Sequence, residues 1–255
     1  MGLQPDQSYP ARDLFEAMIV LSANDAAEAL AGAAVGGRAA TLQAMNDTAR
    51  ALQAADTFAA TPDGLDAPGQ MTSAYDLALI ARAALRRSDF HAYDSMLKAA
   101  VAARGSTVGG LTHNRLLASY PGAYAGKDGY TFKAGQVWWG AAERGGSHLI
   151  VVVVDPGPRP VTQEISLLDW GFAADHKVGP VGELVDPHSG AAGQLAGIGG
   201  AAGSVAAGAY PHRVAAAGVF NRAAVPLVIG AAALLALRLR RRRLTALRER
   251  RRPAQ

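Results

Sequence analysis

The sequence predicts an α+β domain followed by one membrane-spanning helix. Three observations lead to this class. Segments with helical periodicity fill the first 87 residues, strand-like segments follow residue 129, and an apolar run near the C-terminus ends at a cluster of arginines. Half of the 255 residues are hydrophobic, which is enough for a sizeable buried core.

The helical segments come first along the chain. Apolar residues at helical spacing predict four of them, at about residues 13–21, 24–34, 38–54 and 73–87. Asn24 and Asp25 are good N-caps for the second helix, which is expected to run through Ala34. The fourth begins at a capping box, Ser73 to Asp76, after a Pro- and Gly-containing loop at 61–69.

After Gly129 the pattern of apolar residues changes from helical to strand-like. Residues 137–142 and 148–154 are strand-like, and the Arg-Gly-Gly segment at 144–146 joins them. They predict an antiparallel hairpin, and residues 161–172 are expected to return as a helix packed on that sheet.

The C-terminal third has a different composition. Residues 190–209 hold almost no large apolar side chain, so no core can form there. The apolar run 223–237 falls short of a bilayer core of about 30 Å, but extension back to Val214 makes it long enough if Arg222 snorkels. The expected segments are a domain at 1–174, a Gly/Ala-rich linker at 175–213, a transmembrane helix at 214–239 and a basic tail at 240–255.

The arginines after the apolar run predict the orientation. A basic flank stays in the cytoplasm, so the protein is expected in the cell membrane, single-pass, with its body outside and its C-terminus cytoplasmic. A short amphipathic or buried helix is the alternative for the apolar run, and a nucleic-acid patch is the alternative for the tail.

Charge and composition exclude several classes of function. The whole chain has a net charge of +4, and the nine Arg and one Glu between residues 238 and 252 contribute +8. The rest of the chain therefore has a net charge of −4, so the body is mildly acidic and no nucleic-acid surface is expected on it. There is no cysteine, the six histidines have no ligand spacing, and no phosphate loop is present. Neither a metal nor another cofactor is therefore expected.

Three local patterns carry the chemistry. They are the Ser-Ala-Asn at 22–24, the Thr-Pro-Asp-Gly-Leu at 61–65 and the Gly-Lys-Asp-Gly-Tyr-Thr at 126–131. In this order and spacing they resemble the low-molecular-mass D-alanyl-D-alanine carboxypeptidases, the S11 serine peptidases, over residues 11–172. The resemblance implies the penicillin-binding-protein/β-lactamase-like transpeptidase fold, an antiparallel sheet flanked by helices.

The resemblance also implies roles for individual residues. Ser22 would relay the proton to the leaving D-alanine, and Asn24 would hold the peptide amide. Lys127, with Asp128 and Gly129 in the place of the family's Lys-Thr-Gly, would meet the substrate carboxylate, and the backbone N–H of Tyr130 would form half of the oxyanion hole. Without the family context, Ser22 and Asn24 are explained as helix caps, and Lys127 as a solvated loop lysine.

The sequence departs from the family pattern in two places. No Ser-x-x-Lys, the family's nucleophile motif, precedes Ser22, so the fold is expected to be incomplete at the N-terminus. The match at Ser95–Lys98 comes after Ser22 and is interpreted as chance, although the two side chains could share a helix face. At the second place, Asp128 replaces a threonine donor by an acceptor that repels a carboxylate.

Two functions follow from these observations. The first is a serine-type D-alanyl-D-alanine carboxypeptidase that acts on peptidoglycan stem peptides, impaired by the missing motif and by Asp128. The alternative is a non-catalytic, membrane-anchored peptidoglycan-binding or regulatory protein. The expected partners are a stem peptide ending in D-Ala-D-Ala and a membrane, and β-lactams only if the nucleophile is restored. A β-lactamase is a weaker third choice, because no extra carboxylate motif for deacylation is visible.

Overall fold

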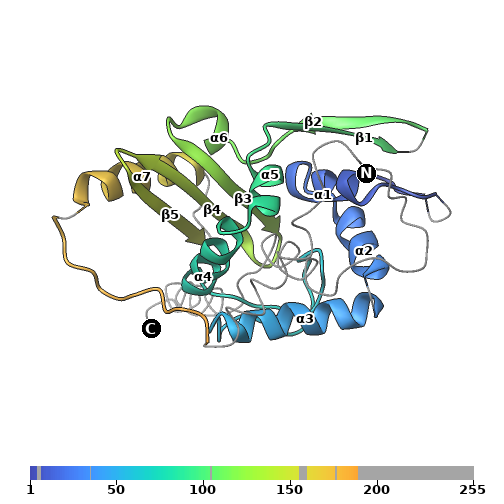
Figure 1. Cartoon of the computed structure of the whole chain (residues 1–255), viewed down its shortest axis with the longest axis horizontal. Coiled ribbons are helices and arrows are strands. Elements are labelled where there is room, and N and C mark those ends of the chain that lie inside the picture. The colour runs from blue at the N-terminus through green and yellow to red at the C-terminus, as the bar shows by residue number, and fades with distance from the viewer. Residues whose placement is uncertain (5–6, 35, 104, 155–159, 176, 189–255) are drawn as a thin grey trace, which may run out of the picture.

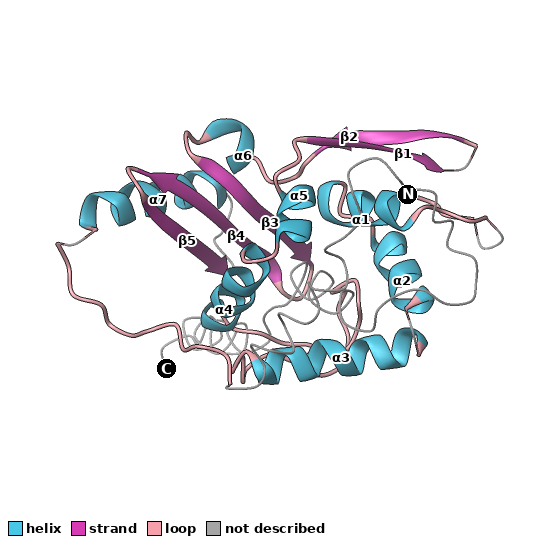
Figure 2. Ribbon diagram, viewed as in Figure 1, coloured by secondary structure: helices cyan, strands magenta, loops and turns pink. Residues whose placement is uncertain are grey.

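A computed structural model describes residues 1–4, 7–34, 36–103, 105–154, 160–175 and 177–188. A three-stranded antiparallel sheet lies beside a group of helices, and a separate two-stranded hairpin runs along the outside of the first helix (Figure 1). Helices precede the central sheet in the chain, and one helix follows it (Figure 2). The α+β class expected from the sequence is confirmed.

The N-terminal part is helical, as predicted. Its helices are α1 (Ala11–Val20), α2 (Asn24–Ala33), α3 (Gly37–Ala51), α4 (Ala74–Leu85) and α5 (Ser88–Asp94). On α3 and just after it, Met45, Ala49 and Leu52 are buried, so the apolar stripe seen in the sequence does face the core.

The two predicted helix starts have different outcomes. Ser73 is the N-cap of α4, and its side chain accepts the backbone N–H of Asp76. The prediction that Asn24 and Asp25 cap α2 is wrong, because Ala23 is the N-cap and makes no side-chain bond. Asp25 lies in the first turn of α2, where its Oδ1 accepts the N–H of Ala26, and its Oδ2 accepts the backbone N–H groups of Gly2 and Leu3 in a tertiary contact.

The central sheet has the order β3-β4-β5, with β3 (Ala123–Thr131), β4 (Gly135–Arg144) and β5 (Ser147–Val154). The expected hairpin is β4–β5, with Val137 opposite Val154 and Arg144 opposite Ser147. The helix predicted after it is α7 (Pro160–Ala174), which packs on β4 and β5.

Alternate residues of β4 face two different cores. Trp139 packs with residues of α1 and α2, whereas Trp138 packs with Leu168 of α7. Directly opposed residues of an antiparallel pair share a face of the sheet. Lys127, opposite Trp139, therefore starts on the α1–α2 face, and Asp128, opposite Trp138, starts on the α7 face.

Five elements are not among the segments predicted from the residue pattern, and two of them, α5 and β3, are described above. A hairpin of β1 (Lys98–Ala103) and β2 (Ser106–Leu111) lies against α1, and the one-turn helix α6 (Leu116–Ser119) packs against β3. This hairpin corrects the idea that Ser95 and Lys98 share a helix face. Ser95 is the C-cap of α5, its hydroxyl donates to the carbonyl of His91, and Lys98 begins β1.

The described part of the expected linker lies along the helices. The hydroxyl of Tyr75 donates to the carbonyl of Glu183, Arg82 donates to the carbonyl of Leu184, and the N–H of His188 donates to the carbonyl of Ala51. Residues 177–188 are thus held against α3 and α4.

Among the described residues, no helix is both long enough and apolar enough to cross a bilayer. The predicted transmembrane helix at 214–239, the basic tail at 240–255 and most of the linker lie outside the described residues.

Candidate functional site

Ser22 lies at the corner between α1 and α2 in an uncommon backbone conformation. Its φ is +56°, in the left-handed region that costs a non-glycine residue about 1 kcal/mol. The chain turns here, and the N–H of Ala23 donates back to the carbonyl of Ala17. Such strain tends to occur at functional sites, where surrounding contacts hold it in place.

The Ser22 hydroxyl meets Lys127 from β3. The Lys127 ammonium donates to Ser22 Oγ at 2.5 Å, and the side chain is only 6 % exposed. Burial lowers the pKa of Lys127, against the opposing attraction of Asp128 and then Asp94. The resemblance gave these two residues separate roles and implied no contact between them. They are 105 positions apart in the sequence, and the structure brings them together.

Asp128 takes up the rest of the lysine's donors. The Lys127 ammonium also donates to the Asp128 carbonyl oxygen at 2.5 Å and lies 3.5 Å from Asp128 Oδ1. An ammonium has three N–H donors, and these three contacts use them all. Asp128 is 22 % exposed, so its carboxylate reaches solvent while it neutralises the lysine.

Gly126 permits the strand to pass close to its neighbours. Its φ is +152°, and a Cβ there would lie 2.6 Å from both the Trp139 carbonyl oxygen and the Asn114 side-chain nitrogen. Only glycine fits this position without displacing backbone. The close approach fixes the position of Lys127, the next residue.

Two buried acids flank this part of β3. Asp94, at the end of α5, accepts the Gly126 N–H at 3.0 Å, and burial raises its pKa to about 7. Glu164 of α7 is 3 % exposed, and burial, together with repulsion from Asp128, raises its pKa to about 8. Both acids hold their protons to a higher pH than ordinary carboxyls do.

A groove of about 260 Å³ opens between Ser22 and the end of β3 that begins at Asp128. Its walls come from residues 22–24 and from residues 128–131 of β3, with the loop 63–65 and His113 completing it. Asn24 is exposed in the groove, and Tyr130 is 64 % exposed beside it. Within the described sheet β3 is an edge strand, so half of its backbone N–H and C=O groups point away from β4.

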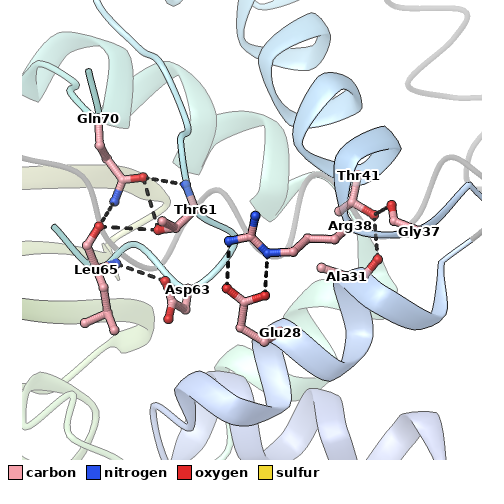
Figure 3. A network of polar contacts seen from close by, with 9 residues as sticks. All are labelled: Glu28, Ala31, Gly37, Arg38, Thr41, Thr61, Asp63, Leu65 and Gln70. Carbon is pink, nitrogen blue, oxygen red and sulfur yellow. Dashed lines mark hydrogen bonds and ion pairs between the residues drawn. The ribbon is translucent and has the colours of Figure 1, made fainter. Parts of the chain in front are cut away.

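The Thr-Pro-Asp-Gly-Leu segment forms the loop over the groove, and Gln70 holds its shape (Figure 3). Gln70 accepts the N–H of Thr61 and donates to the carbonyl of Leu65, while Asp63 accepts the N–H of Leu65. Asp66 accepts the Thr131 hydroxyl at 2.8 Å, which ties the loop to β3.

Sequence reasoning missed three residues of the site. Asp94 and Glu164 lie in helical segments with no motif around them, and His113 is a single exposed histidine that also lines a second cavity of about 540 Å³ beside β2. Only the tertiary structure places them near Ser22 and β3.

Comparison with known proteins identifies the family. Residues 1–157 match the Peptidase S11 family, described as D-alanyl-D-alanine carboxypeptidase. The D-alanyl-D-alanine carboxypeptidase DacB2 of Mycobacterium tuberculosis is 38 % identical over 180 residues, which cover 68 % of this chain and 62 % of that protein. DacD of Escherichia coli is 35 % identical, over 67 % of this chain and 44 % of its own length.

Solved structures agree with this fold. A D-alanyl-D-alanine carboxypeptidase from Mycobacterium tuberculosis has a TM-score of 0.63 at 36 % identity, covering 73 % of this chain and 71 % of that one. Penicillin-binding protein D2 of Listeria monocytogenes, solved in an ampicillin-bound form, has a TM-score of 0.55 at 27 % identity, covering 67 % and 78 %. The chain spans less than two thirds of the length of the curated relatives DacB2 and DacD. It belongs to the S11 family of D-alanyl-D-alanine carboxypeptidases.

Proposed function

We propose that the groove binds peptidoglycan stem peptides ending in D-alanyl-D-alanine, and that its chemistry is that of a serine-type carboxypeptidase in impaired form. The observation that carries this proposal is the contact between the Lys127 ammonium and the Ser22 hydroxyl at one wall of the groove, beside an edge strand. An extended peptide can pair with such an edge through its backbone.

Each residue has a role that follows from its place. The exposed Asn24 amide offers donors and an acceptor to the peptide backbone across from β3. The backbone at Gly129 and Tyr130 faces the groove, where outward N–H groups can polarise a carbonyl. The Ser22 hydroxyl can accept one proton and donate its own proton onward, since Lys127 holds it in place.

One feature favours impairment. Asp128 stands where the family's threonine would donate to the substrate, and it occupies the Lys127 ammonium. The same feature favours the second candidate, a peptidoglycan-binding protein that keeps the groove without turnover. In either case we propose that the apolar segment 214–239 anchors the protein, with the domain outside the cell.

A titration distinguishes binding from turnover. We expect an Nα-acylated peptide ending in D-Ala-D-Ala to bind saturably in calorimetry, and its L-Ala-L-Ala diastereomer to bind at least tenfold more weakly. Asn24→Ala should weaken binding, whereas Gln43→Ala, an exposed change on α3, should not. Equal affinity for both diastereomers would contradict the proposal.

The same protein is then treated with a fluorescent penicillin and assayed for release of D-alanine. We expect neither a covalent adduct nor release, because the groove contains Ser22 as a relay and no second serine beside it in the described lining. A label that disappears in Ser95→Ala would show that Ser95–Lys98 is the nucleophile motif after all.

A further inference from the structure

The charges around the groove do not suit a peptide with a free carboxylate end. Asp63 and Asp128 both contribute to the lining, whereas Lys127 does not appear in it. The Lys127 ammonium lies behind, 6 % exposed, with its donors directed at Ser22 and Asp128. Because Asp128 neutralises the Lys127 ammonium, the charged groups that line the groove are the carboxylates of Asp63 and Asp128, which accept hydrogen bonds and donate none.

Other donors that could receive a carboxylate are also engaged. The Thr131 hydroxyl, at the end of the lining strand, donates to Asp66. Arg38, whose charge interacts with Asp63 at longer range, forms a two-point ion pair with Glu28 (Figure 3). On the α7 side, Glu164 adds a further carboxyl near Asp128. His113, Asn24, the hydroxyls of Ser22 and Tyr130 and backbone N–H groups are the donors that remain in the described lining, and no lysine or arginine is among its residues.

We propose that this groove selects peptides in which the carboxyl after the last D-alanine is masked as an amide, over peptides that end in a free carboxylate. An amide brings N–H donors to Asp128 and carries no negative charge to be repelled by Asp63 and Asp128. The inference rests on the stem-peptide function proposed above and names the form of the peptide that this chain prefers. Asp128 is its specificity-determining residue.

The test compares two peptides that differ in one group. An Nα-acetylated tripeptide ending in D-Ala-D-Ala is prepared as the free acid and as the C-terminal carboxamide, and both are titrated into the full chain by calorimetry. We expect the carboxamide to bind at least tenfold more tightly at low ionic strength, and the difference to shrink when salt screens the acids.

Variants locate the cause of the preference. Asp128→Asn has the same shape but no charge, and it should reduce the preference to threefold or less. Asp47→Asn removes the same charge from the exposed face of α3 and should leave the preference unchanged. A wild-type chain that binds the acid as tightly as the amide, or a preference that survives in Asp128→Asn, would overturn the inference and leave the stem-peptide function standing. Failure of both peptides to bind would remove the proposed function and this inference together.

Discussion

Asp94 makes the stability of the domain depend on pH in a calculable direction. Its side chain is 3 % exposed, its Oδ2 accepts the Gly126 N–H, and its Oδ1 has no partner among the described residues. Burial raises its pKa from 3.8 to about 7. Between these two values the folded state keeps a proton that the unfolded state has lost, so folding stability falls as pH rises.

The expected loss is about 4 kcal/mol at most between pH 4 and pH 7, the free energy that corresponds to this change in pKa. In Asp94→Asn the amide oxygen can still accept the Gly126 N–H, and the group has no proton to lose. The variant should therefore gain stability over the wild type as pH rises through this window, and hold that gain above pH 7.

Urea unfolding at pH 5 and pH 8 measures this difference in stability. The control is the exposed variant Asp47→Asn, which should change the free energy of unfolding by the same amount at both pH values. A stability difference between Asp94→Asn and wild type that does not change from pH 5 to pH 8 would refute the reasoning. The carboxylate would then be solvated or paired in solution.

Three further changes test the same framework. Glu164→Gln should stabilise the domain relative to the wild type increasingly as pH rises toward 8, because the buried wild-type carboxyl, with its pKa near 8, must then ionise. If Glu164 were solvated, thermal unfolding at pH 5 and pH 9 would show no such trend. Gly126→Ala should cost about 2–4 kcal/mol in urea unfolding, since its Cβ meets the Trp139 carbonyl at a positive φ, and a cost below about 0.5 kcal/mol would mean that β3 moves freely. Ser73→Ala should cost about 1 kcal/mol by loss of the N-cap of α4, whereas Ser88→Ala, which caps nothing, should cost less than half of that.

Local signals in the sequence predicted the elements whose stabilising contacts are local. The cap at Ser73 and the β4–β5 hairpin depend on residues a few positions apart, and both are confirmed. The β1–β2 hairpin was missed because β1 reads Lys-Ala-Ala-Val-Ala-Ala, and alanine favours helix. Its strand character comes from alternate burial against α1, which is a tertiary effect.

The candidate site was predictable only through family resemblance. Composition and spacing could not bring Ser22 to Lys127 across 105 positions, whereas the ordered motifs singled out each of them as a site residue without predicting their contact. Asp94 acts on β3 through the backbone N–H of Gly126, a contact that no side-chain pattern encodes. The cap predicted at Asp25 failed for a similar reason, since residues 2 and 3 compete for its carboxylate.

The most direct test of the central claim is to map where a stem peptide binds on the folded chain. Backbone amide resonances of the ¹⁵N-labelled protein are followed by NMR during titration with the tripeptide carboxamide. We expect saturable shifts at Asn24, at Gly129 and Tyr130 on the edge of β3, and in the loop 63–65, with little change along α3. Saturable shifts confined to another surface, or no shift at Gly129 and Tyr130, would contradict the claim that this edge strand and Ser22 form the peptide site.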